Sequence, residues 1–245
     1  MTAVSQTPFS LVGRVALVTG GGGGLGQGIV HALSRAGASV AINDIDPLRV
    51  AKLRAELTAV YGANSADATG DMTDPDETDE VFRSVEASLG AIDIVVLCAT
   101  APQRSAPLSE ESWEYHESML NSFVKSPMVV TQRALPHMKA SGFGRIINIT
   151  SEVFETSEAG SSAYVAAKGA QIGWTRSAAK ELAEFGITVN SVAPGFIPVE
   201  RHADLPHHIL DDYLATVPAG RWGTPEEIGW ACVYFASDEA AFVSG

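Results

Sequence analysis

The feature that most constrains the fold is the alternation of short apolar runs with longer segments of helical period. Such runs predict strands at 14–19, 39–44, 65–69, 92–98, 145–150 and 187–193. Helices are predicted up to about Arg35 after the first strand, and then at about 47–60, 75–88, 111–139 and 163–184. Alternating strands and helices indicate βαβ units, and nearly unbroken apolar strands indicate a parallel sheet covered on both faces. The sequence therefore predicts an α/β fold with a doubly wound parallel sheet.

Composition favours one compact domain that binds a small molecule. The 245 residues contain no Pro/Ser-rich linker, repeat or low-complexity tract, so residues 1–245 are predicted to form a single domain. A net charge of −13 argues against a nucleic-acid partner and against an acidic protein partner. The N-terminus lacks a basic start followed by an apolar run, and no stretch approaches the roughly eighteen apolar residues of a membrane span. We expect a cytoplasmic protein with no membrane contact.

The loop after the first strand reads Thr-Gly-Gly-Gly-Gly-Gly-Leu-Gly over residues 19–26 and opens directly into a helix. Glycines let the backbone approach a pyrophosphate, whose charge the helix N-terminus stabilises. A flexible Gly-rich turn is the alternative, but the preceding strand and following helix favour a dinucleotide site. The loop does not close with a Lys-Ser/Thr pair, which speaks against ATP and phosphate transfer.

The second strand ends at Asp44, where a carboxylate can accept hydrogen bonds from the adenosine ribose and repels a 2′-phosphate. No Arg or Lys lies in the glycine loop or adjoins Asp44. The pattern therefore favours NAD over NADP, although a solvated Asp closing a strand would look the same.

Tyr164 and Lys168 stand four residues apart on a predicted helix, and therefore on one face. A neighbouring ammonium favours the phenolate, which makes Tyr164 a candidate acid or base near neutral pH. Taken alone, the pair is more often a solvated helix face. Ser151 ends the preceding strand, where a simple strand-end cap is the alternative interpretation.

Combined, the Thr-Gly-(x)3-Gly-x-Gly loop, Ser151 and the Tyr164/Lys168 pair resemble the classical short-chain dehydrogenases/reductases from about residue 11 onward. The resemblance implies a Rossmann-like fold and hydride transfer between a nicotinamide and a secondary alcohol or ketone. Tyr164 would exchange the substrate proton, Ser151 would orient the substrate oxygen, and Lys168 would hold the nicotinamide ribose and lower the tyrosine pKa. The implied cofactor-binding residues are Gly20, Gly24, Leu25, Gly26, Asp44, Asp71, Met72, Ala99, Tyr164, Lys168, Pro194, Gly195 and Ile197.

Four features depart from the family's pattern. The fourth strand ends in Leu-Cys-Ala-Thr at 97–100, where the family has Asn-Asn-Ala-Gly. Phe123 takes the place of an asparagine that supports the proton relay, although Asn121 or a local bulge could substitute. Val199 replaces a threonine that contacts the cofactor. At Gly245 either the last segment is missing or the sheet ends one strand short. These departures keep open a second class of function, a dinucleotide-binding protein of this fold with weak or no catalysis.

Residues 199–217 correspond to the family's substrate lid. The lid histidines at 202, 207 and 208 lack a tight ligand pattern, so we expect solvated side chains and no metal. The loop between Ser151 and Tyr164 carries Glu152, Glu155 and Glu158, and an acidic rim favours a neutral or cationic substrate over a carboxylate or an acyl carrier protein. Apolar surroundings indicate that Cys98 and Cys232 are buried, rather than paired in a disulfide or bound to metal.

The resemblance also implies a homodimer or homotetramer, because the family pairs its long helices between subunits. The helices at 111–139 and 163–184 carry apolar positions that suit such an interface, although core packing explains such residues more often. These positions are Trp113, Met119, Trp174 and Leu182.

Overall fold

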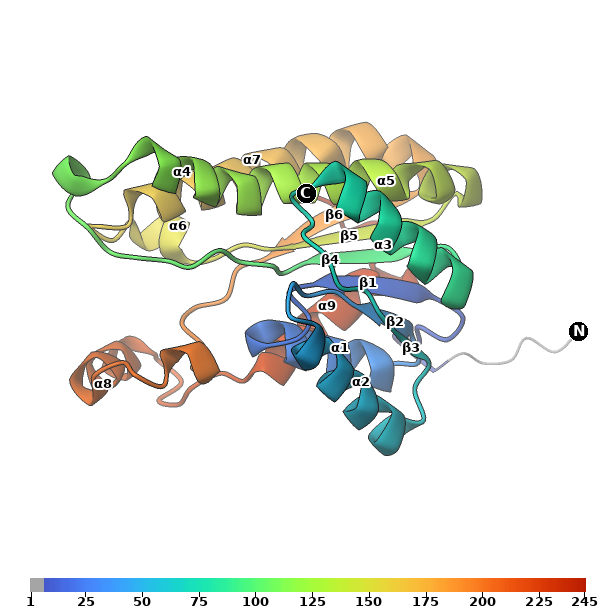
Figure 1. The fold of residues 1–245 in the computed structure, drawn as a ribbon, viewed down its shortest axis with the longest axis horizontal. Helices are drawn as coiled ribbons and strands as arrows, with labels where there is room; N and C mark the ends of the chain where they lie inside the picture. Colours follow the sequence, from blue (N-terminus) through green and yellow to red (C-terminus); the bar gives the residue numbers. More distant parts are fainter. Residues whose placement is uncertain (1–6) are drawn as a thin grey trace, which may run out of the picture.

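The computed structural model describes residues 7–245, in which six strands form one parallel sheet in the order β3-β2-β1-β4-β5-β6 (Figure 1). The chain runs outward from β1 to β3, then returns to the other side of β1 and continues to β6. The order reverses between β1 and β4, which is where doubly wound sheets bind their ligands. The predicted α/β fold is confirmed. The strands are β1 (Val15–Thr19), β2 (Ser39–Ile42), β3 (Ser65–Asp67), β4 (Ile94–Leu97), β5 (Gly144–Ile149) and β6 (Ile187–Val192).

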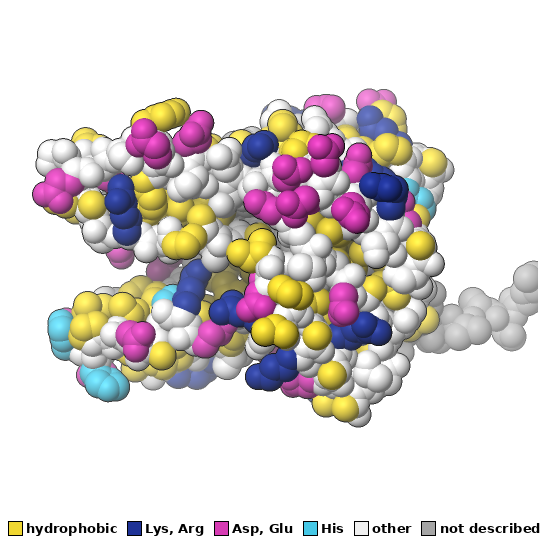
Figure 2. Space-filling model, viewed as in Figure 1, with side chains coloured by type: hydrophobic (Ala, Val, Ile, Leu, Met, Phe, Trp, Pro, Cys, Tyr) yellow, Lys and Arg dark blue, Asp and Glu magenta, His cyan; other side chains and the backbone are white. Residues whose placement is uncertain are grey.

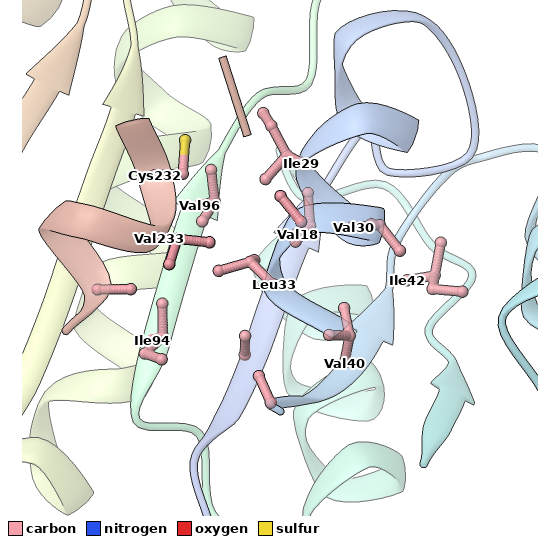
Figure 3. Close-up of a cluster of buried hydrophobic side chains, with 14 of the residues drawn as sticks. Val18, Ile29, Val30, Leu33, Val40, Ile42, Ile94, Val96, Cys232 and Val233 are labelled. Atoms are coloured by element: carbon pink, nitrogen blue, oxygen red, sulfur yellow. The ribbon is translucent and has the colours of Figure 1, made fainter. Parts of the chain in front are cut away.

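Three helices cover one face of the sheet: α1 (Gly24–Arg35), α2 (Pro47–Tyr61) and α9 (Pro225–Ala236). Alternate strand residues, such as Val18 and Val96, point into this layer (Figure 3). The helices α1 and α9 cross closely, because a Cβ at Gly28 would lie only 2.3 Å from the Pro225 carbonyl carbon. Glycine is therefore required at the crossing.

The opposite face carries α3 (Pro75–Ser88), α5 (Ser126–Ser141) and α7 (Ser162–Leu182). Leu17 and Val95 point into this second layer, one residue out of step with those of the first. Both faces of the strands are thus buried, which is why the strands read as unbroken apolar runs.

The helix predicted at 111–139 is interrupted. The structure has α4 (Trp113–Leu120), a π-helical turn η2 (Asn121–Lys125) and then α5. The π-helical turn places Phe123 in a small third cluster with Met119, Ala163 and Ala167. Such turns insert one residue into a helix and frequently occur at functional sites.

Two of the four apolar positions that suited an interface are core residues. Met119 and Leu182 are almost fully buried within the chain, and Trp174 is half-buried against the second layer. Trp113 alone of the four is exposed, at 66%. Packing against the sheet therefore accounts for most of this apolar pattern.

Several short elements in the last part of the chain were not predicted: α6 (Val153–Thr156), α8 (His207–Thr216) and α9. The start of α9 carries a capping box, in which Thr224 and Glu227 satisfy each other's backbone N–H groups. Short 3-10 helices complete the described residues: η1 (Leu108–Glu110), η3 (Ala183–Phe185), η4 (Glu200–His202) and η5 (Asp238–Ala240).

Past α9, the last residues lie beside β6. The Gly245 N–H donates to the Val189 carbonyl at 2.9 Å, and the Val189 N–H donates to the Ser244 hydroxyl at 3.1 Å. Within residues 7–245, none of the helices combines the length and the apolar character that crossing a membrane requires.

Candidate active site

A cleft of about 1180 Å³ opens beyond the carboxyl ends of the strands. Figure 2 shows its mouth as a deep notch between the α4/α6 side of the molecule and the lid. Every residue predicted for catalysis or cofactor binding lines this one cleft, although the sequence places them in seven separate segments. These residues are Gly20, Gly24, Leu25, Gly26, Asp44, Asp71, Met72, Ala99, Ser151, Tyr164, Lys168, Pro194, Gly195 and Ile197.

The glycine loop has no room for side chains where it turns into α1. Gly20 has φ +64°, and a Cβ there would lie 2.7 Å from the Ala99 Cα. A Cβ at Gly26 would lie 2.0 Å from the Gly20 carbonyl oxygen. These glycines are therefore fixed by sterics. They bring the backbone at the start of α1 to the wall of the cleft, where a diphosphate would bind.

A side-chain carboxylate from the lid lies at the start of α1. The Gly24 N–H donates to Glu200 Oε1 at 2.8 Å, and a Cβ on Gly23 would lie 2.7 Å from the same oxygen. Glu200 belongs to η4 in the lid, so this carboxylate stands in for a phosphate at the helix N-terminus. The contact supports the fit of the loop to a dinucleotide. Sequence reasoning missed Glu200, because nothing in its neighbours marks it as a partner of the loop.

The adenosine end of the cleft brings together Asp44 and a cation that was not predicted. Asp44 is half-buried, and its carboxylate accepts a hydrogen bond from the Asp46 N–H at 3.1 Å. Arg49 lies beside the glycine loop, its Nη1 3.1 Å from the position of a Cβ on Gly23. The sequence signal was available, because Arg49 stands in the first turn of the helix that follows Asp44.

Asp71 and Met72 line the cleft where β3 ends. The Asp71 carboxylate accepts from the Thr73 N–H at 2.8 Å and so shapes its own turn, while the Met72 side chain is buried in the second layer. Asp71 thus presents its carboxyl group to the cleft from a fixed turn.

The Thr19 hydroxyl joins the end of β1 to the end of β4. It accepts hydrogen bonds from the backbone N–H groups of Cys98 and Ala99, at 3.0 and 3.1 Å. Leu97 points into the core in place of the family's first asparagine. Burial raises the pKa of the Cys98 thiol to about 11, so it remains neutral beside the cleft. Both cysteines are free thiols. Cys232 is fully buried as predicted, whereas Cys98 is only half-buried because it lines the cleft.

The Tyr164 phenol lies in the cleft with Ser151 and Gln103. Burial raises its pKa, while hydrogen bonding from Ser151, the positive charge of Arg201 and hydrogen bonding from Gln103 act in the opposite direction. The Ser151 hydroxyl also accepts from the Val153 N–H at 3.2 Å. Gln103 and Arg201 were missed in the sequence, since neither stands in a motif.

Lys168 lies on the same helix face as Tyr164 but is held away from solvent. Its ammonium donates to the Ile149 carbonyl at 2.7 Å and to Gln171 Oε1 at 3.1 Å. Burial lowers its pKa to about 7, with Arg201 acting in the same direction. The expected lowering of the tyrosine pKa by this lysine is not seen here, because desolvation dominates at Tyr164 and Lys168 is not among the groups that oppose it.

Phe123 covers the lysine from the π-helical turn. The Lys168 Nζ lies 3.8 Å from the centre of the Phe123 ring, within reach of a cation–π interaction, and the same ring meets the Tyr164 ring edge-on at 5.5 Å. Asn121 lines the cleft but is not a hydrogen-bond partner of Lys168. A local bulge is present, as foreseen for this position, and it presents an aromatic ring rather than an amide.

Aromatic side chains fasten the lid beside Ser151. The Tyr213 hydroxyl donates a short hydrogen bond to Glu152 and accepts from the Phe196 N–H at 2.8 Å, while its ring stacks on Trp222. Burial raises the pKa of the Tyr213 phenol, and the bond to Glu152 acts in the same direction.

The charges around the cleft only partly match the predicted acidic rim. Glu152 and Glu158 line the cleft, whereas Glu155 is exposed outside it. Arg201 brings a positive charge to the same mouth. His202 accepts from the Val199 N–H through Nδ1 at 3.2 Å, so it serves the local fold of the lid. The other two lid histidines, His207 and His208, are exposed at the start of α8.

The fold and the glycine cradle define the class: a dinucleotide-binding α/β protein of the Rossmann type, with a tyrosine and a lysine in its cleft. The family model described as "Enoyl-(Acyl carrier protein) reductase" matches residues 21–245. The chain belongs to the classical short-chain dehydrogenases/reductases, a family of nicotinamide-dependent oxidoreductases that act on CH–OH and C=O groups.

Relatives match along nearly the whole chain. Nodulation protein G of Azospirillum brasilense is 36% identical over 234 residues, which are 95% of this chain and 94% of that protein. A 3-oxoacyl-[acyl-carrier-protein] reductase of Thermotoga maritima is 34% identical over 96% of this chain and 95% of its own. A solved 3-oxoacyl-(acyl-carrier-protein) reductase of Agrobacterium tumefaciens, with NADP bound, superposes with a TM-score of 0.90 at 30% identity, covering 100% of this chain and 96% of its own.

Proposed function

We propose that this protein is an NAD(H)-dependent oxidoreductase that acts on a small secondary alcohol or ketone through Ser151, Tyr164 and Lys168. One observation carries the proposal: these three side chains meet in the same cleft as the glycine loop and the start of α1. A bound nicotinamide would supply or accept the hydride. Because they share this cleft, Ser151, Tyr164 and Lys168 can act together on one substrate.

The side chains divide the remaining work. Tyr164 gives its phenolic proton to the substrate oxygen during reduction and takes it back during oxidation. The Ser151 hydroxyl hydrogen-bonds that oxygen and fixes its direction. Lys168 would hold the nicotinamide ribose, and its ammonium would favour the phenolate form of Tyr164. The Tyr213 and Glu152 pair closes the substrate side and excludes water.

Asp44 supports a preference for NAD(H), because its carboxylate would meet a 2′-phosphate at close range. Arg49 acts in the other direction, since a guanidinium beside the glycine loop suits that phosphate. A solved relative has NADP bound, so the cofactor preference of this protein has to be measured. We expect kcat/KM to be higher with NAD than with NADP. Asp44→Asn should lower the ratio of the two kcat/KM values. A ratio that favours NADP in the unchanged protein would overturn the preference.

Glu152 and Glu158 support a neutral or cationic substrate rather than a carboxylate or an acyl carrier protein. The Thermotoga maritima relative is named for an acyl-carrier-protein substrate, so 3-oxoacyl carrier protein belongs in the test as the competing substrate. Turnover of that substrate at rates above those of small neutral ketones would remove the charge argument.

A second candidate function is dinucleotide binding without significant turnover. Two observations favour it: burial raises the pKa of the Tyr164 phenol, and the Phe123 ring rather than an amide stands over Lys168. Cofactor fluorescence on mixing with NADH measures binding, and a panel of secondary alcohols and ketones with NAD(H) measures turnover. Turnover that Tyr164→Phe abolishes while NADH binding persists supports the enzyme. Binding without turnover across the panel supports the second function.

The exposed Trp113 on α4 supports the proposal of a homodimer or homotetramer. Light scattering of the purified protein tests it, and the mass of a single chain would overturn it.

A further inference from the structure

Beside Lys168 lies a series of hydrogen-bonded, uncharged polar side chains that do not line the cleft. Asn148 on β5 and Gln171 and Thr175 on α7 are 0%, 1% and 2% exposed. Burying three such groups between a sheet and a helix destabilises the fold unless each finds its hydrogen bonds. Each of these groups therefore needs a specific hydrogen-bond partner, and the series of hydrogen bonds that they form ends at Lys168.

The direction of every hydrogen bond in this series is set from its far end. The Thr175 hydroxyl donates to the Gln171 backbone carbonyl at 2.9 Å, so its oxygen is free to accept, and it accepts from the Asn148 amide at 3.0 Å. Asn148 Oδ1 must then accept, and the Gln171 amide donates to it at 3.1 Å. The remaining polar atom, Gln171 Oε1, can only be an acceptor, and it faces the Lys168 ammonium at 3.1 Å.

We propose that Gln171 is a positioning residue of the active site, which holds the Lys168 ammonium in place through this directed series of hydrogen bonds. The catalytic meaning of the inference rests on the proposed function, whereas the placement of the lysine does not. In the family, an asparagine supports a proton relay at the position where this chain has Phe123. Gln171 takes over part of that role from α7.

The lysine ammonium has two hydrogen-bond acceptors and lies near two aromatic rings, of which Phe123 is the nearer at 3.8 Å and Tyr164 the farther at 5.7 Å. Ile149 offers a backbone carbonyl, Gln171 a side-chain oxygen, and Phe123 its ring face. Ile149 is a backbone contact that mutation leaves in place, and the Phe123 ring is a weak acceptor. Gln171 is thus the partner through which the chain tunes the site.

Other titratable groups act on Lys168 from around the cleft, and the test must leave them unchanged. Arg201 in the lid lowers the pKa of Lys168, the neutral Cys98 thiol lies at the end of β4, and Tyr164 lies one turn away on the same helix. Substitutions at Gln171 change none of these side chains.

Two substitutions at Gln171 are expected to shift the pKa of Lys168 in opposite directions. Gln171→Met fills the same space without an acceptor, so the buried ammonium loses a hydrogen bond and the Lys168 pKa falls by about one unit. Gln171→Glu places a carboxylate beside the ammonium, so the pKa rises by about one unit or more. If Gln171 only filled space, the two substitutions would not shift the Lys168 pKa in opposite directions.

The experiment follows Lys168 directly, by NMR titration of protein labelled with 13C-lysine at Cε. Lys168→Met identifies its signal by removing it. Thr131→Val is the matched control, because Thr131 on α5 is buried, its hydroxyl has no partner in the described chain, and it does not line the cleft. We expect a lower midpoint in Gln171→Met, a higher one in Gln171→Glu, and no change in Thr131→Val.

Activity forms the second arm, through the pH profile of kcat/KM for the same variants. In an active enzyme the profile should move with the NMR midpoint in both directions. An unchanged midpoint in the folded Gln171 variants overturns the placement, and if Gln171→Met does not fold, Gln171→Glu decides. A midpoint that moves while the profile stays fixed overturns the catalytic role. A midpoint that moves in a protein without turnover supports the placement and removes the proposed function instead.

Discussion

Neutralising Glu200 should tighten the binding of the cofactor. In the structure its carboxylate accepts a hydrogen bond from the Gly24 N–H at 2.8 Å, at the helix N-terminus that a diphosphate would use. The two anions compete for the same site, so the cofactor must first displace the lid. Glu200→Gln keeps the size of the side chain and removes the charge that makes the contact favourable.

The contact is exposed, which sets the size of the effect. A charge at an exposed helix N-terminus contributes about 0.3–1 kcal/mol, and this free energy corresponds to a Kd for NADH that is about two- to fivefold lower in Glu200→Gln. The difference should shrink at high salt, because exposed charges are screened.

Titration of NADH fluorescence in the unchanged protein and in Glu200→Gln measures the change. Glu226→Gln is the control, because Glu226 is an exposed carboxylate that pairs with Arg35 at 2.6 Å, outside the cleft. A Kd that is unchanged, or higher, in Glu200→Gln would refute the competition between the lid and the diphosphate.

Three further predictions concern stability. Burial lowers the pKa of Lys168 from its ordinary 10.5 to about 7 in the folded protein, so the folded state loses stability as pH falls from about 10.5 to about 7. Lys168→Met should lack this loss, which urea unfolding at pH 7 and pH 10 would detect. Phe123→Ala should cost about 3–4 kcal/mol, because the ring is 2% exposed in a small cluster, and a loss below 1 kcal/mol in urea would contradict its packing role. Gly28→Ala should cost about 2–3 kcal/mol, because its Cβ would overlap Pro225, and thermal unfolding checks this against exposed Gly62→Ala as a measure of backbone strain alone.

The sheet was predictable because its strands are buried on both faces and its helices carry sharp starts. Pro47 and Pro75 stand at first helical positions after Asp46 and Asp74, and each Asp side chain caps its helix. The break at Asn121–Lys125 was not predictable as a helical element, because a π-helical turn inserts a residue without changing the local composition. Only the resemblance to the family drew attention to this position.

The candidate site was predictable where a motif fixes the spacing along the chain, as for Ser151, Tyr164 and Lys168. Residues that reach the cleft from distant segments were not. Gln103 lies in a loop, and Glu200 and Arg201 lie in the short 3-10 helix η4, whose contacts depend on how the lid folds over the cleft. The raised pKa of the Tyr164 phenol was not predicted, because it comes chiefly from burial and the sequence does not report the burial of single atoms.

The Thr19 hydroxyl holds the floor of the cleft through backbone hydrogen bonds, whereas side chains such as Glu200 and Tyr213 hold the lid. By accepting from the Cys98 and Ala99 N–H groups it joins the end of β1, where the glycine loop begins, to the end of β4. Ordering of the floor is therefore complete before any ligand arrives, and its entropy is lost during folding rather than during binding. The remaining entropy of binding belongs to residues 199–217, so substitutions there should alter rates of entry and release more than substitutions in the floor.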